Sequence, residues 1–139
     1  MSKLKILIVD DEPDIRALVA EILADEGYEV ALADSAEQAR IARRANKPDL
    51  VLLDIWMPGT DGISLLREWS SSGLAFPVIM MSGHGNVETA VEATRLGAYD
   101  FIEKPLSLAK LLLTVNRALE ADQLRQENLK LKKRLPDPI

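Results

Sequence analysis

DLVLLD at residues 49–54, followed at once by IWMPG at residues 55–59, indicates one strand of a parallel β-sheet and the turn that ends it. Leu50 to Leu53 are all apolar, which is typical of a strand buried on both faces of such a sheet. The Pro-Gly pair predicts that the chain turns directly afterwards. Open α/β sheets bind ligands at the carboxyl ends of their strands, so Asp54 lies where a site is expected.

The rest of the chain alternates in the same way between apolar runs and amphipathic segments. This alternation predicts a parallel sheet with crossover helices. The further strands are expected at Leu4–Val9, Tyr28–Ala33, Pro77–Met81 and Tyr99–Ile102. The helices between them are expected from Pro13 to Gly27, from Ser35 to about Asn46, around Ile63, Leu65, Leu66 and Trp69, and from the cap Asn86 to Gly97.

Local signals mark several helix ends. Pro13 suits a first helical turn, and Gly27 is a natural stop. Ser35 with Gln38 has the spacing of a capping box. Asp61 and Gly62 are interpreted as turn and helix-start residues.

The last helix is predicted to begin near Ser107 and to be unusually long. Four of its residues can pack on the sheet: Leu111, Leu112, Val115 and Leu119. Beyond them the steps of four and three typical of a coiled-coil seam join Leu124, Asn128, Leu131 and Leu135, before Pro136 and Pro138 end the helix. Two heptads are few, so a dimerising helix and a frayed monomeric tail both fit this pattern.

Composition excludes several function classes. The length of 139 residues suggests one domain. The chain has no cysteine, which excludes disulfides. Its one histidine, His84, excludes a multi-histidine zinc site. A net charge of −5 argues against nucleic-acid binding through the overall field. No apolar run reaches the roughly 18 residues of a membrane span, and the first residues do not have the pattern of a cleavable signal peptide. A soluble, cytoplasmic domain is expected.

Polar residues stand at four of the expected strand ends. Asp10 and Asp11 follow the first strand, Asp54 the third, Ser82 the fourth and Lys104 the fifth. Three neighbouring carboxylates repel one another unless a cation offsets them, and oxygen ligands favour a hard ion such as Mg²⁺. With Lys104, this arrangement could place an aspartate in line with an incoming phosphoryl group.

Taken singly, the same residues have simpler interpretations. Asp11 and Ser82 could be helix caps, and Lys104 with Pro105 could be only a turn. His84 is interpreted as a loop residue rather than a catalytic base. Phe101 could be core filler, a role that is compatible with a function in switching.

In combination, these motifs resemble the receiver domains of two-component response regulators over about Leu4–Leu119. The motifs that carry the resemblance are VDDE at 9–12, LD at 53–54 with MPG at 57–59 and DG at 61–62, MSG at 81–83 and EKP at 103–105. The resemblance implies a flavodoxin-like (βα)5 doubly wound parallel sheet with strand order 2-1-3-4-5. It also implies a receiver domain at residues 1–120 and a helical linker or dimerisation extension at 121–139.

The resemblance also implies a role for each site residue. Asp54 would be the phosphoacceptor, and Mg²⁺ would be held by Asp10, Asp11, Asp54 and the backbone carbonyl of Trp56. Ser82 would be the switch hydroxyl and Lys104 the phosphate-contacting lysine. Phe101 would be the aromatic switch, and the peptide bond before Pro105 would be cis.

The run SGHGNVETAVEATRLGAYDFIEKP at 82–105 and the long last helix resemble regulators of the NtrC/NtrX nitrogen-regulation type. This implies a sensor histidine kinase as phosphodonor, and ATPase and DNA-binding output domains outside this segment. A homodimer is expected, with no direct nucleic-acid or membrane contact by this segment.

Two rival functions remain to be compared. A Mg²⁺-dependent phosphatase of the haloacid-dehalogenase type needs a second acid two residues after its nucleophile, where this chain has Trp56. A pseudo-receiver that acts only as an interaction module is expected to lack an acid or the lysine, and none is missing. The chain is therefore expected to be a switch rather than a turnover enzyme, and bulky Trp56 is hypothesised to slow hydrolysis of an acyl phosphate.

Overall fold

A five-stranded parallel sheet forms the centre of the computed structural model, which describes residues 3–83, 87–104 and 107–134. Its strands are β1 (Lys5–Val9), β2 (Glu29–Ala33), β3 (Leu50–Asp54), β4 (Val78–Ser82) and β5 (Asp100–Glu103). They lie in the order β2-β1-β3-β4-β5, so the expected strand order is confirmed.

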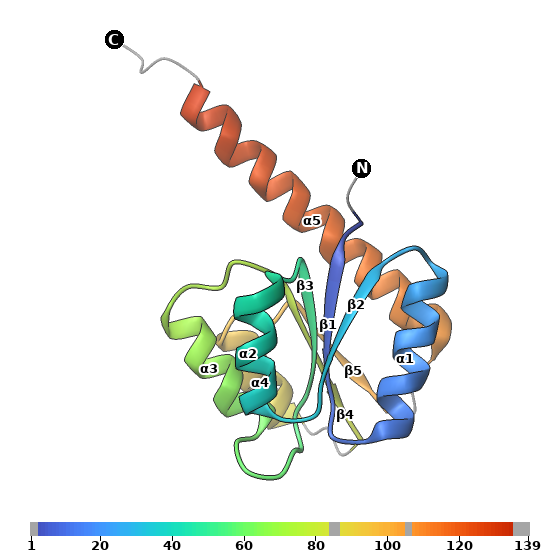
Figure 1. The fold of residues 1–139 in the computed structure, drawn as a ribbon. Coiled ribbons are helices and arrows are strands. Elements are labelled where there is room, and N and C mark those ends of the chain that lie inside the picture. Colours follow the sequence, from blue (N-terminus) through green and yellow to red (C-terminus); the bar gives the residue numbers. More distant parts are fainter. Residues whose placement is uncertain (1–2, 84–86, 105–106, 135–139) are drawn as a thin grey trace.

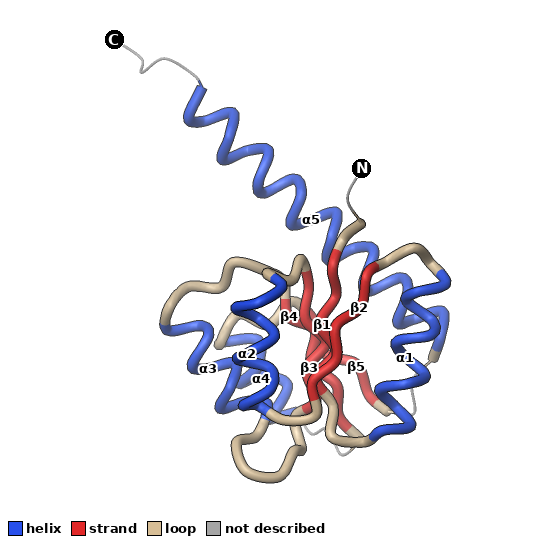
Figure 2. Tube along the Cα trace, viewed as in Figure 1, coloured by secondary structure: helices blue, strands red, loops and turns tan. Residues whose placement is uncertain are grey.

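In the described part of the chain, five helices cover the two faces of this sheet. They are α1 (Pro13–Asp25), α2 (Ala36–Asn46), α3 (Gly62–Ser71), α4 (Val87–Arg95) and α5 (Leu108–Arg134). Helices α1 and α5 lie on one face, while α2, α3 and α4 lie on the other (Figure 1). Figure 2 shows the strands as a middle layer between these two groups of helices. The doubly wound α/β fold is thus confirmed.

The alternation of side chains along the central strands divides the core into two clusters. In β3, Leu50 and Leu52 pack with α1 and α5, whereas Val51 and Leu53 pack against the opposite helices. All four are completely buried. A strand with helices on both faces needs an apolar residue at every position, which explains the uninterrupted run in the sequence.

Three of the expected strands, β3, β4 and β5, are one residue longer at their carboxyl ends than the apolar pattern indicates. Two of these extensions concern site residues. Asp54 is the last residue of β3 and pairs in register with Met81, and Ser82 is the last residue of β4 and pairs with Glu103. Both polar residues therefore belong to the sheet, whose hydrogen bonds fix their backbone positions.

The helix ends largely follow the predicted signals. Ser35 Oγ accepts a hydrogen bond from the backbone N–H of Gln38 (3.2 Å), and Asp61 Oδ1 accepts one from Ser64 (2.8 Å). Gly27 has φ +93°, a conformation that favours glycine after a helix. The proposed cap Asn86 lies outside the described residues.

Helix α5 continues far beyond the sheet (Figure 1). Its first half contributes Leu111, Val115, Ala118 and Leu119 to the core. Further along, Leu124 is 61% exposed and Leu129 is 48% exposed, so these two side chains lie largely outside the core. Within the part of the chain that the structure covers, no helix is both long and apolar enough to cross a membrane.

Candidate functional site

The carboxyl edge of the sheet brings the predicted polar residues together. Asp10 directly follows β1, Asp54 ends β3, Ser82 ends β4 and Lys104 directly follows β5. Asp10 and Ser82 are completely buried, and Asp54 is 2% exposed. Buried acids are costly unless a cation or hydrogen bonds compensate for them, so the surroundings of these groups determine what the edge can do.

Lys104 provides the positive charge of the site. Its Nζ lies 2.9 Å from Asp10 Oδ2, 3.5 Å from Asp54 Oδ1 and 3.5 Å from Glu12 Oε1. Its backbone N–H donates a hydrogen bond to the carbonyl of Ser82 (2.8 Å), which fixes the base of the side chain beside β4. One ammonium group therefore contacts three carboxylates.

Asp10 is held from several directions. Its Oδ1 accepts a hydrogen bond from the backbone N–H of Glu12 (2.9 Å), and its carbonyl accepts one from Arg16 Nη1 (2.7 Å). Its buried Oδ2 is paired with the ammonium of Lys104 but has no further hydrogen-bond partner within the described segments. This oxygen therefore retains the capacity to bind a cation.

Asp10 also belongs to a group of acids that is suited to a hard cation. Single carboxylate oxygens of Asp10, Asp11 and Glu12 all lie within 4.8 Å of one another. Oxygen donors at this spacing, one of them on the buried Asp10, fit Mg²⁺, which uses one or two carboxylates and retains several waters. The donor set is thus compatible with the metal that the sequence predicts.

The protonation of Asp54 depends on its burial and on the charged groups around it. Burial and the neighbouring charges of Asp10 and Asp11 raise the pKa of Asp54 to about 7, against the lowering effect of Lys104. Burial alone lowers the pKa of Lys104, but the attraction of Asp10 and Asp54 outweighs it and raises that pKa. Lys104 therefore stays charged, whereas Asp54 requires a further cation to be fully ionised at neutral pH.

A close backbone approach positions the loop that follows Asp54. The N–H of Gly62 donates to the carbonyl of Ile55 (2.8 Å). A Cβ atom at residue 62 would lie 2.1 Å from the carbonyl oxygen of Asp54. Only glycine permits this contact, so the start of α3 is packed directly against the end of β3.

Two aromatic residues lie at different depths around the site. Phe101 is half-buried, pairs in register with Met80 of β4 and packs against the core on the α2–α4 side. Trp56 is 53% exposed and lines a hollow of about 190 Å³ together with Glu88 and Glu92 of α4. The core-filler interpretation of Phe101 thus has structural support, and Trp56 lies at the surface, two residues after Asp54.

Glu12 is the site contact that the sequence interpretation missed. Glu12 is the third acid of the DDE run, two residues beyond the first acid at the strand end, and its position in the sequence does not indicate that it contacts Lys104. The N-cap position of α1 falls on Glu12, so the alternative interpretation of Asp11 as the helix cap is wrong. His84 and Pro105, with its predicted cis bond, lie outside the described residues.

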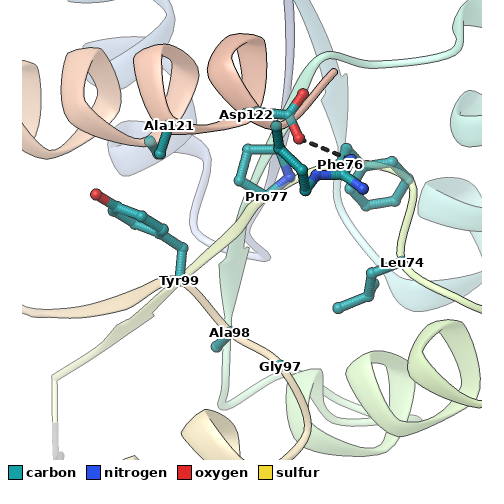
Figure 3. Close-up of a pocket in the computed structure, with 10 residues that line it drawn as sticks. Leu74, Phe76, Pro77, Gly97, Ala98, Tyr99, Ala121 and Asp122 are labelled. Carbon is teal, nitrogen blue, oxygen red and sulfur yellow. Dashed lines mark hydrogen bonds and ion pairs between the residues drawn. The ribbon is translucent and has the colours of Figure 1, made fainter. Parts of the chain in front are cut away.

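A second hollow, of about 450 Å³, lies at the opposite end of the sheet (Figure 3). Pro77 and Tyr99, which precede β4 and β5, line it together with Ala121 of α5. Its charged groups, Asp122 and Arg125, are paired with each other at 3.0 Å. The acids and the lysine are therefore confined to the carboxyl edge, away from this hollow.

The fold and this edge together define an α/β domain of the receiver type. Residues 6–116 match the response regulator receiver domain, and the chain belongs to this family. Domains of this family accept a phosphoryl group on an aspartate and act as switches.

Relatives and solved structures of the NtrX type are among those that match the chain. The chain is 51% identical over 129 residues to the nitrogen assimilation regulatory protein NtrX of Azorhizobium caulinodans, covering 91% of this chain and 28% of that protein. The crystal structure of the NtrX receiver domain from Brucella abortus matches with a TM-score of 0.78 and 55% identity, covering 83% of this chain and 98% of that one.

A crystal structure of a longer NtrX chain from Brucella abortus matches with a TM-score of 0.89 and 48% identity. That match covers 99% of this chain and 32% of the other, so the chain spans about a third of the NtrX protein or less. The resemblance to the NtrC/NtrX type is thus confirmed.

Proposed function

We propose that Asp54 accepts a phosphoryl group from a sensor histidine kinase or a small phosphodonor, in a site where Mg²⁺ is bound by Asp10, Asp11, Asp54 and the backbone carbonyl of Trp56. The bound Mg²⁺ would offset negative charge on the acids and on the incoming group. An Asp54 oxygen would attack the phosphorus, and the bond between phosphorus and the donor atom would break with its electron pair leaving on the donor.

The observation that carries this proposal is the position of Lys104. Its ammonium lies between Asp10 Oδ2 and Asp54 Oδ1, at 2.9 and 3.5 Å, in a largely buried edge. A cation fixed beside a nucleophilic carboxylate can neutralise a phosphoryl oxygen without reorganisation, which is the main contribution a protein makes to this reaction.

The proposed switch starts from the new charge on Asp54. The phosphoryl group attracts the Ser82 hydroxyl and the Lys104 ammonium, and Phe101 follows into the vacated space. A shift from 1:99 to 99:1 between two states requires about 5.5 kcal/mol. Charge-assisted hydrogen bonds of about 1.5–3 kcal/mol each can supply this. The face formed by α4, β5 and α5 would change as a result.

In the proposed function, the last helix transmits the conformational change from the receiver domain to the output domains. Residues 1–120 form the receiver domain, and residues 121–139 form a helical linker that supports a homodimer and leads towards ATPase and DNA-binding domains. The exposed Leu124 on the projecting part of α5 supports this assignment. The setting is cytoplasmic, and the domain itself contacts neither nucleic acid nor membrane.

The position of Trp56 argues against the phosphatase alternative. A turnover enzyme of that type needs an acid two residues after its nucleophile, and this position carries a half-exposed indole. The pseudo-receiver alternative is disfavoured because Asp10, Asp54 and Lys104 are in contact.

The test is acyl-phosphate labelling with acetyl phosphate and Mg²⁺. Asp54→Asn is expected to abolish labelling, while Asp34→Asn serves as a matched control because Asp34 is an exposed acid directly after β2 at the same sheet edge. Labelling that persists in Asp54→Asn would contradict the assignment. Steady release of phosphate from varied phosphomonoesters would favour the phosphatase instead.

A further inference from the structure

Glu12 occupies the N-cap position of α1 without acting as a cap. Its side chain makes no capping hydrogen bond to the helix. Asp, Asn, Ser and Thr are the residues whose side chains stabilise this position, and Glu is not among them. The backbone N–H of Glu12 is already satisfied by Asp10 Oδ1 (2.9 Å). The start of α1 therefore does not depend on the Glu12 carboxylate.

The carboxylate points instead to the lysine of the site. Glu12 Oε1 lies 3.5 Å from Lys104 Nζ, the same distance that separates this ammonium from Asp54 Oδ1. The Glu12 side chain is 59% exposed, whereas that of Lys104 is only 10% exposed. Glu12 is thus the solvent-facing partner of a lysine that is otherwise enclosed.

The reach of Lys104 is limited by its backbone. Its N–H is bound to the carbonyl of Ser82, so the side chain extends from a fixed point beside β4. From that point one ammonium is divided between Asp54 and the two acids of the β1–α1 segment, Asp10 and Glu12. Any closer approach to oxygens on Asp54 must weaken its contact with Glu12.

We propose that Glu12 is a positioning residue that restrains Lys104 in the unphosphorylated domain and so opposes phosphorylation of Asp54. This inference rests on the proposed function of Asp54. The Glu12 carboxylate competes with phosphoryl oxygens for the same ammonium. Because Glu12 is exposed, its hold on Lys104 is modest and weakens as salt screens it.

The test uses beryllofluoride, a stable phosphoryl mimic, with the 139-residue chain. Trp56 is the reporter because it is exposed two residues from Asp54, whereas the second tryptophan, Trp69, is 2% exposed in the core. Mg²⁺ is first titrated alone, since Glu12 also lies near the Asp10 and Asp11 oxygens and its loss is expected to weaken Mg²⁺ binding. Beryllofluoride is then titrated at saturating Mg²⁺ for each variant.

Glu12→Gln is expected to lower the apparent Kd for beryllofluoride about threefold at low salt, and the gain is expected to shrink in about 1 M salt. Asp14→Asn is the matched control, because Asp14 is an exposed acid in the first turn of the same helix. It is expected to bind beryllofluoride like the wild type. Thermal unfolding verifies that both variants are folded.

The outcomes separate this inference from the function on which it rests. Equal beryllofluoride affinity in Glu12→Gln and wild type overturns the restraint while leaving Asp54 as phosphoacceptor. An equal gain in Asp14→Asn also overturns it, because the cause would then be the general negative field rather than the contact with Lys104. Failure of the wild-type chain to bind beryllofluoride overturns the proposed function and the restraint together.

Discussion

Asp54 is expected to oppose folding at neutral pH in the absence of a metal. Its folded-state pKa of about 7 exceeds its ordinary value of 3.8. Between these values the folded chain retains a proton that the unfolded chain has lost, so this group's contribution to stability falls as pH rises from about 4 to 7. Burial of the carboxylate is the main physical cause, and repulsion from Asp10 and Asp11 adds to it.

Asp54→Asn removes this titration. In EDTA it is expected to raise the free energy of unfolding at pH 7.5 by on the order of 2 kcal/mol, with a much smaller gain at pH 5. Urea unfolding at the two pH values measures the difference, with Asp34→Asn as control. A gain of equal size at both pH values would show that removal of the charge is not the cause.

Trp56 is expected to lengthen the life of the phosphoryl group. Trp56 follows Asp54 by two residues and is 53% exposed, and we expect its indole to limit the approach of water to an acyl phosphate on Asp54. Trp56→Ala should therefore shorten the half-life of the acyl phosphate several-fold at constant Mg²⁺, as followed by loss of label after the phosphodonor is removed. An unchanged half-life would show that the indole does not shield the site.

The amino-acid sequence predicts which residues gather at the site, because the ends of the apolar runs predict where the strands end. Asp10, Asp54 and Lys104 meet as expected, since parallel strands end at one edge. Glu12 was not predictable in the same way. Its contact with Lys104 depends on how the β1–α1 segment turns beside the end of β5, and this is set by packing rather than by spacing along the chain.

At the scale of elements, the junction of β3 and α3 is expected to be intolerant of any side chain at residue 62. Gly62→Ala places a methyl group against the backbone of Asp54, so the loop must shift. We expect a loss of about 3 kcal/mol in the free energy of unfolding and weaker beryllofluoride binding. Denaturant unfolding and titration measure the two effects.

Gly83→Ala is the control for this substitution. A Cβ atom at Gly83 has an ordinary contact, 3.9 Å from Lys104 Cβ. Its effect on stability is expected to stay within about 0.5 kcal/mol. If both glycine variants behave alike, the close approach at Gly62 is not what limits the loop.

The helices and strands themselves were largely predictable, and their exact ends were not. Ser35 and Asp61 begin helices as their side chains suggest, because a cap is a local interaction. Asp54 and Ser82 extend their strands by one residue beyond the apolar run. Hydrogen bonding to neighbouring strands determines that extension, and a polar residue carries no local signal of it.

At the scale of the whole molecule, the core is expected to be independent of the second half of α5. Among the residues whose burial the structure describes, the last member of the core along the chain is Leu119. A chain ending at Ala121 should therefore unfold within a few degrees of the full chain and bind beryllofluoride equally well. Differential scanning calorimetry and fluorescence titration measure these properties.

The same truncation is expected to abolish dimerisation. Sedimentation velocity of the full chain, with and without beryllofluoride and Mg²⁺, measures the oligomeric state. Leu124→Glu in the full chain is a second way to disturb the predicted seam, and it retains the helix. If the full chain sediments as a monomer under all conditions, the projecting helix does not act as a dimerisation element.

The direction of α5 determines where other proteins can bind to the domain. The helix begins beside the site, after β5, and runs back along the sheet until Ala121 and Arg125 border the hollow at the far end. On the proposed function, a phosphodonor would therefore approach Asp54 at one end of the sheet, while the projecting part of α5 lies at the other end. We expect a donor protein and a domain attached to α5 to bind without competing for the same surface.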